Sequence, residues 1–211
     1  GATEEITPFN GYIDSIEAQV DMAAIREARL KVALDPMFGV SKTSLQTILM
    51  TARVDVEVIN DRHDTLFGGR LPSPTSHTLQ ALARYVVENG CDLGIATDGD
   101  ADRIGIIDDL GHFLHPNQLL VILYYYLLKY KGWSGPVVRN VATTSLLDDV
   151  AERFGVAGHD GGVGAQADRL SAGGNGLVDG LLKDEDKLSK ASKKLTDRIV
   201  KEAKKQLGIH S

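Results

Sequence analysis

The feature that most constrains the fold is an apolar segment that runs directly into three closely spaced aspartates. Residues 91–97 are largely apolar and predict a buried β-strand, and Asp98, Asp100 and Asp102 follow without a spacer. A second apolar run at residues 104–107 predicts another strand just after this acidic segment. Ligands of open α/β sheets collect at the C-terminal ends of strands, so the acidic segment is expected where chemistry takes place.

Upstream of this strand, helical and extended patterns alternate as in a doubly wound α/β unit. The expected helices cover residues 14–28 (with Ile16, Val20, Ala23, Ala24 and Ala28 on the buried face), residues 41–51, and a stretch capped by Thr75 or Ser76 that ends at Gly90. The expected strands cover residues 30–34 and 54–58, and residues 64–74, with two glycines and two prolines, predict an irregular loop. We therefore expect an α/β fold, a doubly wound mixed sheet sandwiched by helices.

A second α/β unit is expected to begin near residue 111. His115-Pro116 starts a strongly apolar helix that extends to about residue 130, since proline suits the first helical turn. A strand over residues 137–141 and a helix over residues 144–154 follow, so this is a partial second unit of the same kind.

The expected domains follow from these patterns. They are an α/β domain over residues 1–110 that ends in the acidic segment, the start of a second α/β domain over residues 111–155, and an unassigned remainder over residues 156–211. The remainder is typical of a glycine-rich linker followed by a charged C-terminal helix at residues 186–207.

Charge and cysteine content exclude several classes of protein. A net charge of -6 argues against a nucleic-acid partner, which needs a basic face. No segment has the length of a membrane-spanning helix and the N-terminus lacks a signal-peptide pattern, so no membrane partner is expected. Cys91 is the only cysteine, which excludes a disulfide framework and favours a reducing compartment. We expect a cytoplasmic protein.

The acidic segment has the composition of a metal site. Residues two apart can project to the same side of an extended or turning chain, so Asp98, Asp100 and Asp102 can converge on one cation. Mg²⁺ prefers such oxygen ligands and leaves positions open for a phosphate oxygen, which suits phosphoryl transfer. Arg103 comes next in the sequence and can hold a phosphate through a bidentate contact. We expect three metal ligands and one catalytic arginine.

Three other interpretations of this segment are open. It could be a solvated acidic turn, although a buried strand rarely leads into three surface aspartates. The three aspartates and Asp109 have the spacing of a calcium-binding EF-hand loop, but Arg103 stands where that loop needs glycine and position twelve lacks glutamate. An aspartyl-phosphate phosphatase would use Asp98 as nucleophile and Asp100 as acid, but Ala101 follows where such enzymes usually carry Thr or Val.

The run Asp98-Gly99-Asp100-Ala101-Asp102-Arg103, preceded by Leu93-Gly94-Ile95-Ala96, resembles the metal loop of the phosphohexomutase family (phosphoglucomutase/phosphomannomutase). Other segments resemble motifs of the same family in the same order: Leu-Asp-Pro-Met-Phe-Gly at 34–39, Phe-Gly-Gly-Arg-Leu-Pro-Ser-Pro at 67–74, Leu-His-Pro-Asn-Gln at 114–118 and Val-Ala-Thr-Thr-Ser at 141–145. The resemblance covers residues 11–155, which correspond to the central domains of the family only.

The resemblance implies a four-domain enzyme of carbohydrate metabolism that moves a phosphoryl group between the 1- and 6-positions of a hexose phosphate. The reaction passes through a phosphoserine and a bisphosphorylated sugar intermediate. Asp98, Asp100 and Asp102 would then bind Mg²⁺ with the phosphoserine, and Arg103 would support the phosphoserine or the transferred phosphate. The expected partners are the hexose phosphate, the bisphosphorylated intermediate and the missing domains of the same parent protein, which we expect to be a phosphoglucomutase.

The sequence also departs from the family pattern. It contains no copy of the family's serine loop, Thr-Ala-Ser-His-Asn-Pro, and no sugar-selecting loop of the Gly-Glu-Glu/Ser-Ser type. We therefore expect a fragment that is inactive in isolation. A non-catalytic metal-binding α/β module and an independent aspartyl-phosphate phosphatase are the alternatives. For Arg139, on the strand expected at 137–141, contact with substrate phosphate and a structural ion pair are both open.

Overall fold

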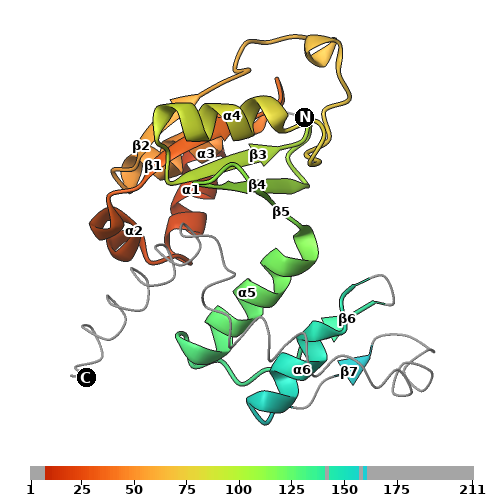
Figure 1. The fold of residues 1–211 in the computed structure, drawn as a ribbon. Coiled ribbons are helices and arrows are strands. Elements are labelled where there is room, and N and C mark those ends of the chain that lie inside the picture. Colours follow the sequence, from red (N-terminus) through yellow and green to blue (C-terminus); the bar gives the residue numbers. More distant parts are fainter. Residues whose placement is uncertain (1–7, 141–142, 157–158, 161–211) are drawn as a thin grey trace, which may run out of the picture. The chain divides into compact units, whose positions relative to one another are not determined.

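The computed structural model describes residues 8–140, 143–156 and 159–160, and the chain divides into two compact units between Phe113 and Leu114 (Figure 1). The first unit contains a mixed sheet with helices on both faces. The second contains two helices and a short parallel strand pair. The domain ranges expected from the sequence include residues outside the described ones and stay predictions.

The sheet of the first unit has the strand order β2-β1-β3-β4-β5. Its strands are β1 (Lys31–Asp35), β2 (Asp55–Val58), β3 (Leu93–Thr97), β4 (Ile104–Asp108) and β5 (Phe113–Leu114). Strand β1 pairs in parallel with both β2 and β3, whereas β4 runs antiparallel to β3 with Thr97 opposite Ile104. The mixed sheet confirms the predicted fold class, and the short edge strand β5 was not predicted.

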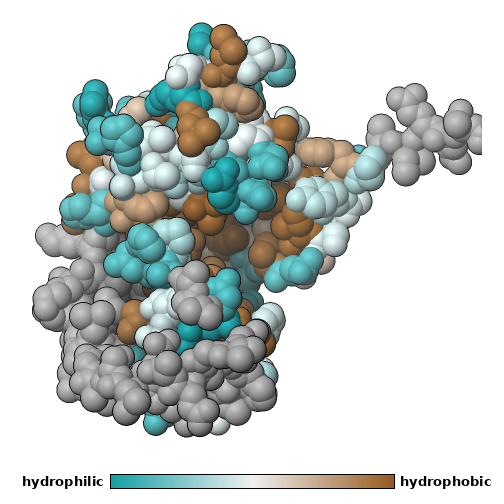
Figure 2. All heavy atoms as spheres, turned by 90° about the vertical axis from the view of Figure 1, so that its right-hand side faces the viewer, coloured by the Kyte–Doolittle hydropathy of each residue, from teal (hydrophilic) through white to brown (hydrophobic). Residues whose placement is uncertain are grey.

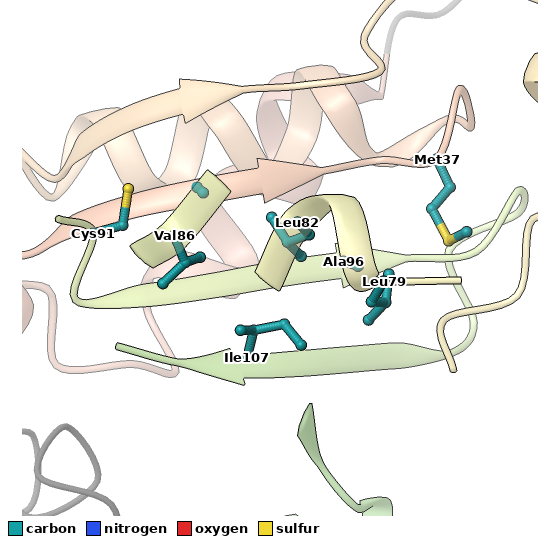
Figure 3. Close-up of a cluster of buried hydrophobic side chains, with 8 residues drawn as sticks. Met37, Leu79, Leu82, Val86, Cys91, Ala96 and Ile107 are labelled. Carbon is teal, nitrogen blue, oxygen red and sulfur yellow. The ribbon is translucent and has the colours of Figure 1, made fainter. Parts of the chain in front are cut away.

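Helices pack on both faces of this sheet, as predicted. They are α1 (Phe9–Glu17), α2 (Met22–Ala28), α3 (Ser41–Thr51) and α4 (Gln80–Asn89), with a short 3₁₀ turn η1 (Phe67–Gly69). Figure 1 shows α4 on one face and α1, α2 and α3 on the other. On the α4 face, Leu82 and Val86 pack with Ala96 and Ile107 in a buried cluster (Figure 3). On the opposite face, Val32 packs in a second buried cluster.

Two helix predictions in this unit are wrong in detail. The single helix over residues 14–28 is two helices, because the Asp21 side chain accepts a hydrogen bond from the Ala24 N–H (2.9 Å) and starts α2 anew. Ile13 is the buried residue of α1, while Val20, predicted to be buried, is 43% exposed. Thr75 bonds to Thr78 in a turn that precedes α4, so neither Thr75 nor Ser76 caps that helix. Its end at Gly90, with a left-handed backbone, is confirmed.

The second unit is built around a β-α-β connection. Its elements are α5 (Pro116–Lys129), β6 (Val138–Arg139), α6 (Leu146–Arg153) and β7 (His159–Asp160), and β6 and β7 are parallel. Tyr124 and Leu128 of α5 are buried against α6. Strand β7 falls in the stretch predicted to be linker, while the helix predicted at 186–207 lies outside the described residues. Among the described helices, none has the length and apolar character needed to span a membrane.

Candidate metal centre

The three aspartates lie on a tight loop that joins the antiparallel strands β3 and β4. The loop closes through hydrogen bonds from the Ala101 N–H to the Asp98 carbonyl (3.2 Å) and from the Asp98 N–H to the Arg103 carbonyl (3.3 Å). Ala101 adopts a left-handed backbone with φ of 67°. This turn brings one carboxylate oxygen of each of Asp98, Asp100 and Asp102 within 4.8 Å of the others. The predicted convergence of these three side chains is therefore present.

The three carboxylates differ in their exposure to solvent. Asp98 is completely buried, whereas Asp100 and Asp102 are exposed. Arg103 compensates the buried charge, because its backbone N–H donates to Asp98 Oδ1 (3.0 Å) and its guanidinium Nε donates to Asp98 Oδ2 (2.7 Å). A buried carboxylate is tolerated where such charge-assisted bonds replace water. Asp98 is thus a fixed member of the cluster.

The electrostatics of the loop follow from these contacts. Burial alone would raise the pKa of Asp98, but the backbone N–H and the guanidinium of Arg103 outweigh burial and lower that pKa to about 2. The pKa of Asp102 is raised, because it shares a hydrogen bond with Asp98 and lies beside the charges of Asp98 and Asp100. Negative charge is therefore concentrated at this end of the sheet, and a cation bound there would relieve the repulsion.

Ser73 is a member of the site that the sequence did not reveal. Arg103 Nη1 donates to Ser73 Oγ (3.0 Å), so the guanidinium is held from two sides while 60% of the side chain stays exposed. Ser73 belongs to segment 67–74, one of the segments that resemble family motifs. Its hydrogen bond joins residues thirty positions apart, so no local sequence pattern predicts it. The guanidinium is oriented, and it keeps N–H groups free for an anion.

The loop that carries Ser73 also lies against the metal loop. A side chain on Gly99 would lie 3.1 Å from the Phe67 ring and 3.5 Å from Pro72, so these residues pack closely on the loop backbone. Leu66 and Leu71, by contrast, are each 76% exposed. In Figure 2, hydrophobic and hydrophilic side chains lie side by side on the face that is turned to the viewer.

The geometry bears on the competing interpretations of the acidic segment. A solvated turn does not explain why Asp98 is fully buried and bonded at both oxygens. In an aspartyl-phosphate phosphatase Asp98 would be the nucleophile that attacks the phosphoryl group, but both of its oxygens are buried and accept hydrogen bonds from Arg103. The flanking elements are strands β3 and β4, whereas an EF-hand loop joins two helices.

Arg139 lies in the second unit and makes an ion pair there. Its Nε and Nη2 donate to Asp148 Oδ2 at 2.9 and 2.6 Å, and its side chain is 8% exposed. This supports the structural role for Arg139, one of the two that the sequence left open.

Comparison with known proteins identifies the family. The family model for phosphoglucomutase/phosphomannomutase α/β/α domain II matches residues 10–111, and that for α/β/α domain III matches residues 115–167. A phosphoglucomutase/phosphomannomutase of Thermococcus kodakarensis is 34% identical over 144 residues, which cover 68% of this chain and 31% of that protein. A phosphopentomutase of the same organism is 33% identical over 142 residues, which cover 67% of this chain and 31% of that protein.

A solved structure gives the same assignment. The crystal structure of a protein from Thermus thermophilus, provisionally described as a phosphomannomutase, superposes with a TM-score of 0.68 at 28% identity. The match covers 77% of this chain and 38% of that protein. The chain spans about a third of the length of the curated relatives that it matches. With two consecutive domain models and the mixed sheet in agreement, the chain belongs to the phosphoglucomutase/phosphomannomutase family.

Proposed function

We propose that this chain supplies the magnesium-binding centre of a phosphohexomutase that interconverts hexose 1-phosphate and hexose 6-phosphate. The observation that carries the proposal is the convergence of Asp98, Asp100 and Asp102 within 4.8 Å, with the first of them buried and fixed. The remaining domains of the parent protein would contribute the phosphoserine and the substrate-phosphate contacts. The chain alone is then a metal-binding part without turnover.

The donor set fits Mg²⁺. Hard carboxylate oxygens are the ligands that Mg²⁺ prefers, and two of its ligands lie at most about 4.2 Å apart, twice the metal–oxygen distance. Because Asp100 and Asp102 are exposed side chains on a turn, they can close the small remaining gap toward the fixed Asp98. No buried side chain has to move.

Each residue of the site would have a separate role. Bound Mg²⁺ would neutralise charge on the phosphoryl oxygens, which supplies much of the catalysis in phosphoryl transfer. Asp98 would fix the position of the site, and the exposed Asp100 and Asp102 would complete the ligand set. Arg103, oriented by Asp98 and Ser73, would present its free N–H groups to a phosphate.

For the substrate of the parent protein we propose a glucose phosphate, hence phosphoglucomutase activity. The relative named phosphopentomutase matches these residues nearly as well as the one named phosphoglucomutase/phosphomannomutase. The sugar is therefore expected to be selected outside the matched residues. A panel of glucose, mannose, glucosamine and pentose phosphates, assayed with the parent enzyme, tests this part of the proposal.

Titration of the purified chain with MgCl₂ tests the metal centre. Asp98→Asn, Asp100→Asn and Asp102→Asn should each weaken Mg²⁺ binding by roughly tenfold or more, since changes to residues that merely support metal ligands cost 10–100-fold. Asp14→Asn, an exposed aspartate on α1, is the control and should bind as the unchanged chain does. If all three loop variants bind Mg²⁺ as tightly as the unchanged chain does, the assignment is refuted.

Two assays separate the alternatives. Isomerisation of glucose 1-phosphate by the purified chain alone would contradict the non-catalytic role proposed for it. Beryllium fluoride that forms an acyl-phosphate mimic on Asp98 would instead favour an aspartyl-phosphate phosphatase.

A further inference from the structure

The turn that follows β1 is held by a buried carboxylate. Asp35 is 2% exposed; its Oδ1 accepts a hydrogen bond from the Met37 N–H (2.8 Å), and its Oδ2 accepts one from Asn60 Nδ2 (2.9 Å). Burial raises the pKa of Asp35, against the opposing effect of these two bonds and of the nearby Arg70 charge. Burying an acidic side chain costs free energy, so a carboxylate at this position indicates a structural or functional role.

The backbone held by Asp35 adopts an uncommon conformation. Met37, Phe38 and Asn60 all have positive φ angles, of 49°, 63° and 52°, although none is glycine. Such conformations persist only where the surroundings enforce them, and they cluster at functional sites. Here the Phe38 N–H also donates to the Asn60 carbonyl (3.0 Å), which ties the two strained segments together. Met37 is anchored in the buried cluster of Figure 3.

This turn touches the backbone of the metal loop directly. The Val40 N–H donates to the Gly99 carbonyl (3.1 Å). A side chain on Gly39 would lie 2.6 Å from the Gly99 carbonyl oxygen and 2.8 Å from that of Asp98, so the two backbones meet without an intervening atom. One residue further on, Ser41 Oγ and Thr97 Oγ1 lie 2.5 Å apart. Gly99 is thus fixed from the β1 side between two proposed metal ligands.

We propose that Asp35 is a positioning residue for the metal loop. By holding residues 36–40 against Gly99 it sets the spacing of Asp98 and Asp100, an inference that rests on the proposed Mg²⁺ centre. Asp35 does not touch the cation. It acts through the Val40–Gly99 hydrogen bond and through the close approach of Gly39.

Two substitutions at Asp35 separate geometry from charge. Asp35→Ala leaves the buried Met37 N–H without its acceptor and should weaken Mg²⁺ binding by roughly tenfold, as expected when the support of a ligand is removed. Asp35→Asn keeps an oxygen for the Met37 N–H, and its amide can donate to Asn60 Oδ1 after rotation of the Asn60 amide. This conservative variant should restore affinity to within about twofold of the unchanged chain.

A matched control accounts for any loss of Mg²⁺ affinity that comes from lower stability alone. Val54→Ala opens the buried cluster on the opposite face of the sheet, where Val54 packs with Val32 and Ala52 and with no residue of the turn or of the metal loop. Variants are compared by MgCl₂ titration after their free energies of unfolding have been measured. Amide exchange is followed at Val40 and Ala101, whose N–H groups hold the two loops.

The outcomes are distinct. Weaker Mg²⁺ binding and faster exchange at Ala101 in Asp35→Ala, beyond those in Val54→Ala and restored by Asp35→Asn, support the inference. Equal behaviour of Asp35→Ala and Val54→Ala overturns it. If the unchanged chain binds no Mg²⁺, the proposed metal centre fails, and the exchange at Val40 and Ala101 alone decides whether Asp35 positions the loop.

Gly39→Ala provides a second test if Asp35→Ala does not fold. It leaves the Asp35 bonds intact and places a methyl group 2.6 Å from the Gly99 carbonyl oxygen, so one of the two backbones must shift. Mg²⁺ binding should again weaken by roughly tenfold. Unchanged Mg²⁺ affinity in a folded Gly39→Ala chain would refute positioning through this contact.

Discussion

Asp98 and its two neighbours have different physical roles, although all are aspartates of one loop. The free energy cost of burying Asp98 is offset within the loop by both bonds from Arg103, so this carboxylate is charged and fixed before any cation arrives. Asp100 and Asp102 remain in water and lose little solvation until a ligand draws them in. A site built in this way combines a fixed reference point with adaptable ligands.

On strand β2 of the same sheet, Glu57 predicts a pH-dependent contribution to stability. Lys31 Nζ lies 2.8 Å from Glu57 Oε1, and the Tyr85 hydroxyl donates to Glu57 Oε2. The Lys31 bond, followed by the Tyr85 bond, lowers the pKa of Glu57 below its ordinary value of 4.5. A lowered folded-state pKa adds stability that is present above pH 4.5 and is lost as the pH falls through the lowered value.

Glu57→Gln should therefore be less stable than the unchanged chain at neutral pH, and this difference should disappear in acid. Urea denaturation from pH 7 to pH 2, followed by far-ultraviolet circular dichroism, measures it. Glu88→Gln, at an exposed glutamate on α4, is the control for removal of a surface carboxylate. A Glu57→Gln deficit that persists unchanged at pH 2 would contradict the prediction.

At the scale of the elements, the start of α5 predicts a measurable capping effect. The His115 side chain accepts a hydrogen bond from the Asn117 N–H (3.2 Å), while Gln118 Oε1 accepts one from the His115 N–H (2.9 Å). His115→Ala should lower the free energy of unfolding by roughly 0.5–2 kcal/mol, the range for loss of an N-terminal cap. Denaturant unfolding followed by Trp133 fluorescence reports on this unit.

His115→Asn serves as the control for that prediction, because asparagine is among the preferred capping residues. It should retain most of the stability that His115→Ala loses. If both variants unfold like the unchanged chain, the capping bonds contribute nothing measurable.

Local patterns predicted most of the elements because each depends on nearby residues. Helix α3 begins and ends where its spacing of apolar residues predicted, and Gly90 ends α4. The break between α1 and α2 was missed because Asp21 starts a new helix with one side-chain bond that apolar periodicity does not encode.

The candidate site likewise has features that the sequence predicted and features that it did not. The convergence of the aspartates was predictable from their spacing in sequence. The contacts of Arg103 with Ser73 and of Asp35 with Asn60 join residues far apart in sequence, and only the folded chain reveals them.

For the whole molecule, the two units have separate buried clusters, and the one tryptophan belongs to the second unit. The clusters of the first unit include Leu82 and Val32, and that of the second includes Tyr124 and Val150. The single tryptophan of the sequence, Trp133, belongs to the second unit, whereas the proposed Mg²⁺ ligands belong to the first. Ligand-linked stabilisation of one unit can therefore be observed apart from unfolding of the other.

Mg²⁺ should stabilise the first unit selectively. A ligand that binds only the folded state adds about 2.7 kcal/mol at a free concentration one hundred times its Kd. We expect amide exchange in β3 and β4 to slow in MgCl₂. The denaturant concentration at the midpoint of the unfolding transition followed by Trp133 fluorescence should not change. NaCl at equal ionic strength controls for screening. A shift of the Trp133 transition that follows Mg²⁺ occupancy would instead mean that the two units unfold as one cooperative body.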